Sequence, residues 1–227
     1  MSFTIEKSNL SRLWNRFSGD FSSIALHSHM QTIEENFDER LRQVHKTLPS
    51  SVANIRLFAP RTFQSEQRFL EWKHSRFSLI QVVENLLSQG SNPKDILLSV
   101  SHTSKYSVAI GYAPQKKDSK VYNSIGVDLE SSNRSVSEEA NLRFVSENES
   151  NQPLCPIEFW VIKEACFKAN PRAEETIVAN YTVKQFDFKT GKGSVLCLKQ
   201  KEMDFDFQIV KVDEFIIAFS VSMIKYF

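Results

Sequence analysis

The sequence lacks the features that mark secreted, membrane-spanning and nucleic-acid-binding proteins. Its only cysteines are Cys155, Cys166 and Cys197, and without a C-x-x-C pair they give neither a disulfide framework nor a zinc site. No run approaches the roughly 20 apolar residues of a membrane span, and the segment MSFTIEKSNLSRLW has no apolar core of a secretory signal. Basic residues exceed acidic ones by only one, so no global positive field favours nucleic acid. We therefore expect a cytoplasmic protein that binds neither nucleic acid nor a membrane, and any anion site must be local.

The chain does have the length and the hydrophobic residues for a sizeable core. Its 227 residues, 41% of them hydrophobic, suit one large domain or two small packed lobes. Apolar side chains at helical spacing predict a long helix over residues 65–89, and residues 96–113 predict a hairpin around HTSK. A second helix is expected over residues 156–169, and alternating segments between 180 and 222 predict strands.

A long helix followed by antiparallel strands occurs twice, over residues 65–113 and 157–222. This coarse repeat predicts an α+β fold with two similar lobes, each an antiparallel sheet packed with a long helix, related by a pseudo-twofold axis. The polar segment PQKKDSKVYN is the expected linker, which gives an N-terminal lobe of residues 1–114 and a C-terminal lobe of residues 121–227. A cleft between two such lobes is a common place for a ligand site.

The segment SIGVDLES places two carboxylates on one face of a short strand. Asp128 and Glu130 are two residues apart, so their side chains point the same way, and Gly126 keeps that face clear just upstream. A solvated edge strand is the alternative interpretation, since Asp and Gly are poor strand formers.

The segment FWVIKEACFKA places Trp160, Glu164 and Lys168 on one stripe of a helix, with Lys163 beside that stripe. A structural interpretation exists, because a Glu164–Lys168 pair at i,i+4 stabilises a helix by about 0.2–0.5 kcal/mol. The helix is, however, apolar nearly all round and should be buried. Charged side chains on a buried helix are costly unless they have partners of opposite charge or a functional role.

Three carboxylates could therefore converge from two elements: Asp128 and Glu130 from the strand, and Glu164 from the helix. Oxygen-rich carboxylate sites suit Mg²⁺, which usually shares its coordination shell with substrate phosphates. Lys168, one helical turn from Glu164, could meet those phosphates as a point charge.

Taken together, three motifs resemble those of the 4'-phosphopantetheinyl transferase superfamily. GVDLE, followed about thirty residues later by FWVIKEACFKA, is similar to the paired signatures G-V/I-D-x-E and W-x-x-K-E-A-x-x-K. The upstream LLSVSHTSKYSVAIGYA resembles the S-x-S-H element, in the expected order. RFLEWKHSR resembles a diverged F-L-x-x-R motif. The chain length is similar to that of the two-lobed class, which acts as a monomer.

This resemblance implies a reaction and a set of site residues. Coenzyme A would donate its phosphopantetheine arm to a serine of an apo acyl or peptidyl carrier protein, and 3',5'-ADP would leave. Mg²⁺, with Mn²⁺ as the alternative ion, would be held by the three carboxylates together with the coenzyme A pyrophosphate. Glu164, or Glu130 through a water, would take the serine proton. By motif, Lys168 would contact the phosphates, and Ser101 and His102 the nucleotide end.

The nucleotide end is where the chain departs from the family pattern. SNPKD stands where Gly-Lys-Pro or Gly-Arg-Pro is frequent, and Lys105 stands where a small residue is usual. Lys73 occupies the arginine position of F-L-x-x-R. The candidates for the 3'-phosphate are therefore basic residues near this helix, with a solvated basic helix face as the alternative interpretation: Arg61, Arg68, Lys73 and Arg76.

Two other functions are compatible with these residues. One is a catalytically silent homologue that binds coenzyme A or a carrier protein on the same fold. The other is an unrelated Mg²⁺-dependent phosphoesterase. The presence of all three carboxylates and Lys168 favours the transferase over a decayed site.

Overall fold

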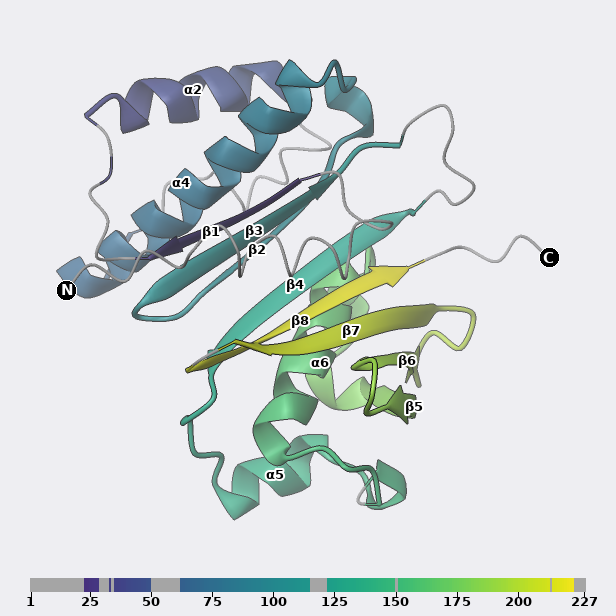
Figure 1. Cartoon of the computed structure of the whole chain (residues 1–227). Helices are drawn as coiled ribbons and strands as arrows, with labels where there is room; N and C mark the ends of the chain where they lie inside the picture. The colour runs from purple at the N-terminus through teal and green to yellow at the C-terminus, as the bar shows by residue number, and fades with distance from the viewer. Residues whose placement is uncertain are drawn as a thin grey trace.

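Four layers of secondary structure, in the order helix, sheet, sheet, helix, make up the part of the chain that the computed structural model describes (Figure 1). The described residues are 23–28, 33, 35–49, 62–114, 122–149, 151–212 and 214–222. Arg61 and most of the predicted linker therefore lie outside the described residues.

The helices and strands divide into an N-terminal and a C-terminal part of the chain. The N-terminal part contains β1 (Ser23–Ser28), α2 (Phe37–Thr47), α4 (Glu66–Ser88), the 3₁₀ turn η1 (Pro93–Asp95), β2 (Leu97–His102) and β3 (Tyr106–Tyr112). The C-terminal part contains β4 (Ser124–Ser131), α5 (Glu138–Phe144), η2 (Glu147–Glu149), α6 (Pro156–Ala169), η3 (Ala173–Glu175), η4 (Val178–Asn180), β5 (Tyr181–Asp187), β6 (Lys192–Cys197), β7 (Asp204–Val212) and β8 (Phe215–Ser222).

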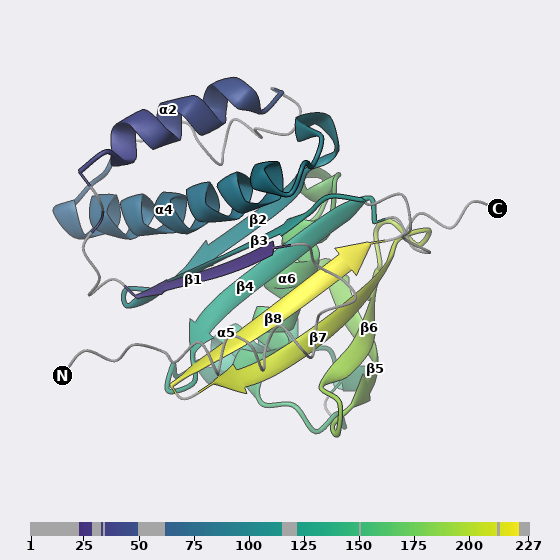
Figure 2. The same ribbon diagram turned by 45° about the horizontal axis from the view of Figure 1, so that its top comes forward.

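The strands form two antiparallel sheets. One has the order β1-β3-β2 and the other the order β4-β8-β7-β6-β5. The long helix α4 covers the outer face of the three-stranded sheet, and α2 lies on α4 (Figure 2). The other long helix, α6, covers the outer face of the five-stranded sheet. The predicted α+β fold with two antiparallel sheets, each packed with a long helix, is confirmed.

Both long helices begin where the sequence has the appropriate capping residues. Ser65 precedes α4 and its hydroxyl accepts a hydrogen bond from the Arg68 amide at 3.3 Å. Pro156 opens α6, where the missing N–H costs no hydrogen bond, and the helix ends before Asn170. No helix in the described part of the chain combines the length and apolar character that a membrane crossing requires.

The two sheets bury a common hydrophobic core between them. In β4 the side chains of Ile125, Val127 and Leu129 point into this core. The alternate residues of the same strand point the other way, toward α6. All eight residues of β8 are buried, since the other sheet covers one face of this strand and α6 covers the other. Asp128 and Glu130 therefore belong to the α6 side of the sheet.

Gly126 allows α6 to pack directly on β4. A Cβ atom at Gly126 would lie 2.0 Å from the carbonyl oxygen of Ala165 and 2.7 Å from the amide nitrogen of Ala169. Both are backbone atoms of the helix, so they cannot move aside separately. The absence of a side chain at Gly126 thus brings α6 close enough for its polar stripe to meet Asp128, as the sequence predicts for this face of the strand.

Candidate functional site

A cavity of about 890 Å³ opens where β2, at the edge of one sheet, meets β4, at the edge of the other. One side of α6, from Trp160 to Lys168, and the segment that follows it complete the wall. Seven of the residues predicted for the site line this cavity: Arg76, Ser101, His102, Asp128, Glu130, Glu164 and Lys168. Residues that are far apart in the sequence are thus brought to one place, and all three predicted carboxylates are among them.

Serine side chains of β2 join the two sheet edges. The Ser99 hydroxyl accepts a hydrogen bond from the Val127 amide at 3.0 Å. The Ser101 hydroxyl donates a hydrogen bond to Asp128 Oδ1 at 2.8 Å. The S-x-S pattern puts both hydroxyls on the same side of β2, because residues two apart in a strand share a face. The first serine anchors the β4 backbone, and the second orients the Asp128 carboxylate.

Asp128 is the most constrained of the three acids. It is only 6% exposed, and its Oδ1 accepts hydrogen bonds from the Ser101 hydroxyl and from Lys168 Nζ, the latter at 2.7 Å. Its Oδ2 is buried as well, yet it has no hydrogen-bond partner among the described residues. An unpaired buried carboxylate oxygen is costly, so this atom is suited to receive a cation or a donor from a ligand.

Glu130 and Glu164 share the cavity with Asp128, and both have raised pKa values. Burial is the main cause for each, and the negative charge of Asp128 adds to it. For Glu130, the neighbouring Arg134 opposes the shift and forms an ion pair with this carboxylate. For Glu164, the nearby Lys168 ammonium opposes it. The carboxylates therefore repel one another in a partly desolvated space.

Lys168 pairs across the helix–strand interface with Asp128, 2.7 Å away, and no Glu164–Lys168 ion pair is found in the described part of the chain. The interpretation of Glu164 and Lys168 as a helix staple is therefore wrong in this geometry. Lys163, from the neighbouring stripe, points elsewhere. It is buried in an ion pair with Glu149 at 2.7 Å and does not line the cavity.

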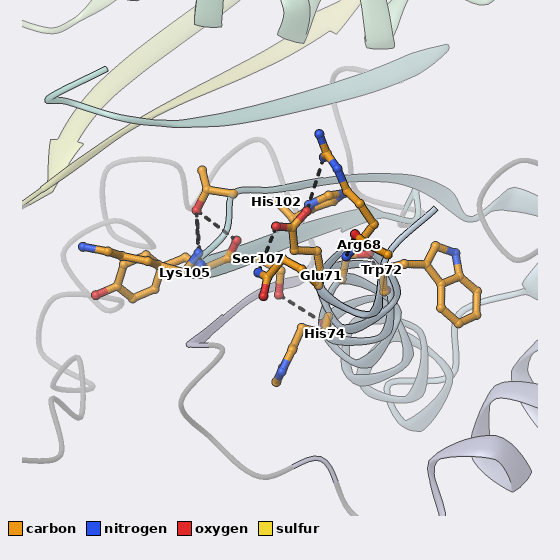
Figure 3. A network of polar contacts seen from close by, with 12 residues as sticks. Arg68, Glu71, Trp72, His74, His102, Lys105 and Ser107 are labelled. Carbon is orange, nitrogen blue, oxygen red and sulfur yellow. Dashed lines mark hydrogen bonds and ion pairs between the residues drawn. The ribbon is translucent and has the colours of Figure 1, made fainter. Parts of the chain in front are cut away.

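His102 ends β2 beside the hairpin turn and faces α4. Its Nδ1 lies 4.0 Å from Oε2 of the buried Glu71, and the same Glu71 oxygen accepts a hydrogen bond from Arg68 at 3.3 Å (Figure 3). Arg68 does not line the cavity, and its side chain is largely exposed. His102 and Arg68 thus both lie next to the Glu71 carboxylate, where β2 meets α4.

The remaining basic candidates lie in different places. Lys73 points away from the cavity, with its ammonium 5.2 Å from the ring centre of Phe37 on α2. Arg76, which is buried, lines the cavity, and its guanidinium lies 5.2 Å from the ring centre of Trp72. Of these two basic candidates, Arg76 lines the cavity and Lys73 does not.

The fit of a divalent cation can be tested on these contacts. Among the described residues, no group of three or more His, Cys, Asp or Glu side chains is placed to hold a metal ion as it stands. The oxygen ligands nevertheless have the chemistry that Mg²⁺ prefers, and the unpaired Oδ2 of Asp128 offers one of them. In this arrangement Lys168 neutralises Asp128 and Arg134 neutralises Glu130. The chemistry of the oxygen ligands therefore suits Mg²⁺, while Lys168 and Arg134 form ion pairs with two of these acids.

Sequence reasoning missed two contacts at the cavity. Arg134 follows Glu130 by four residues, but the two lie on a strand and the turn after it, where no simple spacing rule predicts a pair. Trp160 belongs to the predicted stripe, and its side chain lines the same cavity as Glu130 and opposes the rise in the pKa of that carboxyl, which no helical pattern could indicate. Both contacts depend on how α6 crosses β4.

No protein-family model matches this chain, and no curated protein matches it with significant similarity. The functional assignment therefore depends on the motifs and on the geometry of the cavity.

Proposed function

We propose that the protein is a 4'-phosphopantetheinyl transferase, which moves the phosphopantetheine arm of coenzyme A onto a serine of an apo acyl or peptidyl carrier protein. The observation that supports this best is the meeting of three separate motifs at one cavity. The S-x-S-H element contributes Ser101 and His102, the G-V-D-x-E strand contributes Asp128, and the K-E-A-x-x-K helix contributes Glu164 and Lys168. The proposal includes a pseudo-twofold relation between the helix–sheet halves and a monomeric state, both of which the family resemblance implies.

The cavity has the size and the polarity for a nucleotide-containing donor. A volume of about 890 Å³ is in the range of small-molecule and cofactor sites. In this proposal the nucleotide end lies near His102, with the buried Arg76 in the same wall as a phosphate ligand. The diphosphate then lies beside Lys168 and the carboxylates, which places the transferred arm at the Trp160 end of α6.

The chain's own residues account for the chemistry of transfer. The carrier serine oxygen forms a bond to the pantetheine-side phosphorus, and the bond from this phosphorus to the oxygen that leaves with 3',5'-ADP breaks. Glu164 takes the serine proton, because its raised pKa makes it a stronger base than an ordinary carboxylate and no ion pair engages it in the described structure. Glu130 is less available, since Arg134 holds it. Lys168 neutralises negative charge on the diphosphate.

A bound Mg²⁺ or Mn²⁺, held by Asp128, Glu130 and Glu164, would polarise the diphosphate and offset its charge.

The test is an intact-mass assay on purified protein with coenzyme A, Mg²⁺ and a panel of apo acyl and peptidyl carrier proteins. We expect at least one carrier to gain the mass of one phosphopantetheine group, with release of 3',5'-ADP. Coenzyme A binding with every carrier unmodified would instead indicate a silent binding homologue. Release of 3',5'-ADP without any carrier would indicate a phosphoesterase. Either result would contradict the proposal.

Asp128→Asn provides the matching variant. It keeps the size of the side chain and an oxygen that can accept the Ser101 hydrogen bond, but it removes the charge. We expect kcat/KM for carrier modification to fall by about 10²-fold or more, since loss of a cation ligand has effects of that order. The control is Glu139→Gln on α5, where an exposed carboxylate in a surface pair with Arg143 is neutralised. It should transfer at the wild-type rate.

A further inference from the structure

In the free protein Lys168 forms an ion pair with Asp128. This carboxylate is one of those that the proposed reaction requires to hold a divalent cation. Its Nζ lies 2.7 Å from Asp128 Oδ1, while the buried Oδ2 of the same carboxylate has no partner among the described residues. The same lysine is the one that the proposed function assigns to the diphosphate. One positive charge cannot neutralise both groups, so we expect the group that Lys168 neutralises to differ between the free and the loaded protein.

The surroundings of Lys168 allow it to move, in contrast with those of a second lysine on the same helix. The side chain of Lys163 is 1% exposed, and its ammonium is held by Glu149 and by the Phe144 carbonyl. The side chain of Lys168 is 29% exposed at the cavity wall, and Asp128 is its one ion-pair partner within the described structure. Its flexible four-carbon stem can carry the charge to a new partner without a movement of α6.

We propose that Lys168 is an exchangeable counter-ion, which neutralises Asp128 in the free protein and transfers to the diphosphate when a divalent cation binds the acids. Cation and diphosphate then bind cooperatively, each favouring the state in which the other is bound. The identity of the diphosphate as coenzyme A rests on the proposed function. The exchange itself rests on the Lys168–Asp128 contact and on the unpaired Oδ2.

The charges at the site favour joint binding over binding of either ligand alone. With all three acids ionised, Lys168 and Arg134 leave the cluster with one net negative charge. A divalent cation alone would reverse that sign and repel the ammonium of Lys168 across one carboxylate. A diphosphate alone would add two negative charges beside Asp128 and Glu164. Only the two ligands together restore the original balance, and Lys168 then has the diphosphate as its new partner.

The test measures cation binding directly, without any carrier protein. Mn²⁺ is titrated into the full-length protein, and the free ion is followed by its electron paramagnetic resonance signal, with and without coenzyme A. We expect coenzyme A to lower the Mn²⁺ Kd by about tenfold or more, in the usual range of coupling between sites. Lys168→Met should bind Mn²⁺ at least about fivefold more tightly than wild type in the absence of coenzyme A, and coenzyme A should then add little.

Two variants separate the exchange from a general change of charge. Lys94→Met removes a positive charge from the same cavity, but Lys94 is in no ion pair among the described residues, so its Mn²⁺ affinity should stay close to wild type. Lys168→Arg keeps a cation on Asp128 and should restore weak Mn²⁺ binding. Equal Mn²⁺ affinity in wild type and Lys168→Met would overturn the inference, and so would equal tightening in Lys94→Met. Carrier modification by wild type would still support the proposed function in either case.

Discussion

Glu164 is a partly buried acid whose environment favours the protonated form. Burial, with Asp128 as the second cause, raises its pKa above the ordinary value of 4.5. The folded protein therefore retains this proton to higher pH than the unfolded chain does. Since the folded state binds more protons in the range just above pH 4.5, the free energy of unfolding falls as the pH rises through that range. The charge at Glu164 is thus a cost to the fold that a catalytic role would explain.

We predict that Glu164→Gln raises the Tm at pH 7, because glutamine never becomes charged. The gain should shrink as the pH is lowered and vanish near pH 4, where wild-type Glu164 is protonated in both states. In a chain of this size, each kcal/mol corresponds to about 2–4 °C. Differential scanning calorimetry at several pH values measures this. The exposed Glu139→Gln should show no such trend, and a pH-independent gain at Glu164 would contradict the assignment to its ionisation.

At the scale of single residues, the sequence predicted correctly which side chains share a face of a strand or a helix, because the regular spacing of side chains determines this. Spacing by two put Asp128 and Glu130 on one face of a strand, and spacing by four aligned Glu164 with Lys168. The same spacing also suggested a pair between these last two, which is wrong because the Asp128 carboxylate lies closer across the interface. That contact depends on the crossing of α6 over β4, and no local period contains it.

At the scale of elements, the close contact between α6 and β4 holds the site together. It brings the helix stripe to the strand carboxylates, and Gly126 is the position that permits it. A methyl group there would overlap the backbone of Ala165 and Ala169.

We predict that Gly126→Ala destabilises the protein by about 1–3 kcal/mol or more, since overpacking against backbone cannot be relieved by a side-chain rotation. It should also abolish carrier modification, because α6 must move away from Asp128. Urea unfolding measures the first effect. Gly111→Ala on β3 is the matched control: its Cβ would meet side-chain atoms of Val82 and Leu86. If Gly111→Ala lowers the free energy of unfolding as much as Gly126→Ala does, the backbone contact at Gly126 is no more restrictive than a side-chain contact.

A buried ion pair between Lys163 and Glu149 holds α6 in place away from the cavity. Lys163 donates to the Phe144 carbonyl and to Glu149, which also accepts hydrogen bonds from the amides of Ser146 and Val183. The cluster links the end of α5, the η2 turn, α6 and β5. Its charges are almost fully buried, so each depends on the other.

We predict that Lys163→Met lowers the free energy of unfolding by about 3–5 kcal/mol, since it leaves the Glu149 carboxylate buried and unpaired. Arg143→Met, which breaks the exposed pair with Glu139, should change it by about 1 kcal/mol at most. Urea denaturation of both variants provides the comparison. A loss at Lys163 as small as that at Arg143 would show that Glu149 finds another partner or becomes protonated.

The sequence predicted the helices that have a clear hydrophobic periodicity, but it did not predict β1 or the order of the strands. The helix expected over 65–89 corresponds to α4, and the helix expected over 156–169 to α6. The segment SIALHS gave no clear signal, yet it forms β1, because its place in the sheet depends on pairing with β3 far along the chain. The order β4-β8-β7-β6-β5 was likewise not predictable, since β4 pairs with the last strand across about ninety residues.

At the scale of the whole molecule, the two sheets share one hydrophobic core. The core between them contains side chains of β3 from the first sheet and of β4, β7 and β8 from the second. Ser99 and Ser101 add hydrogen bonds from β2 to β4. The apolar residues of that inner face would be exposed to water if the halves came apart.

We predict that the protein unfolds in a single cooperative transition, with a calorimetric enthalpy equal to the van't Hoff enthalpy. The physical reason is that neither half can bury its inner sheet face without the other, and exposure of contiguous apolar surface is unfavourable. The halves expressed separately, residues 1–114 and 121–227, should each bind a hydrophobic dye, and mixing them should suppress that binding. Two resolved transitions in the intact chain, or a separate half that unfolds cooperatively and binds no dye, would show that the lobes are independent. In that case the cavity between β2 and β4 would be an interface between two domains, and its shape would depend on their relative orientation.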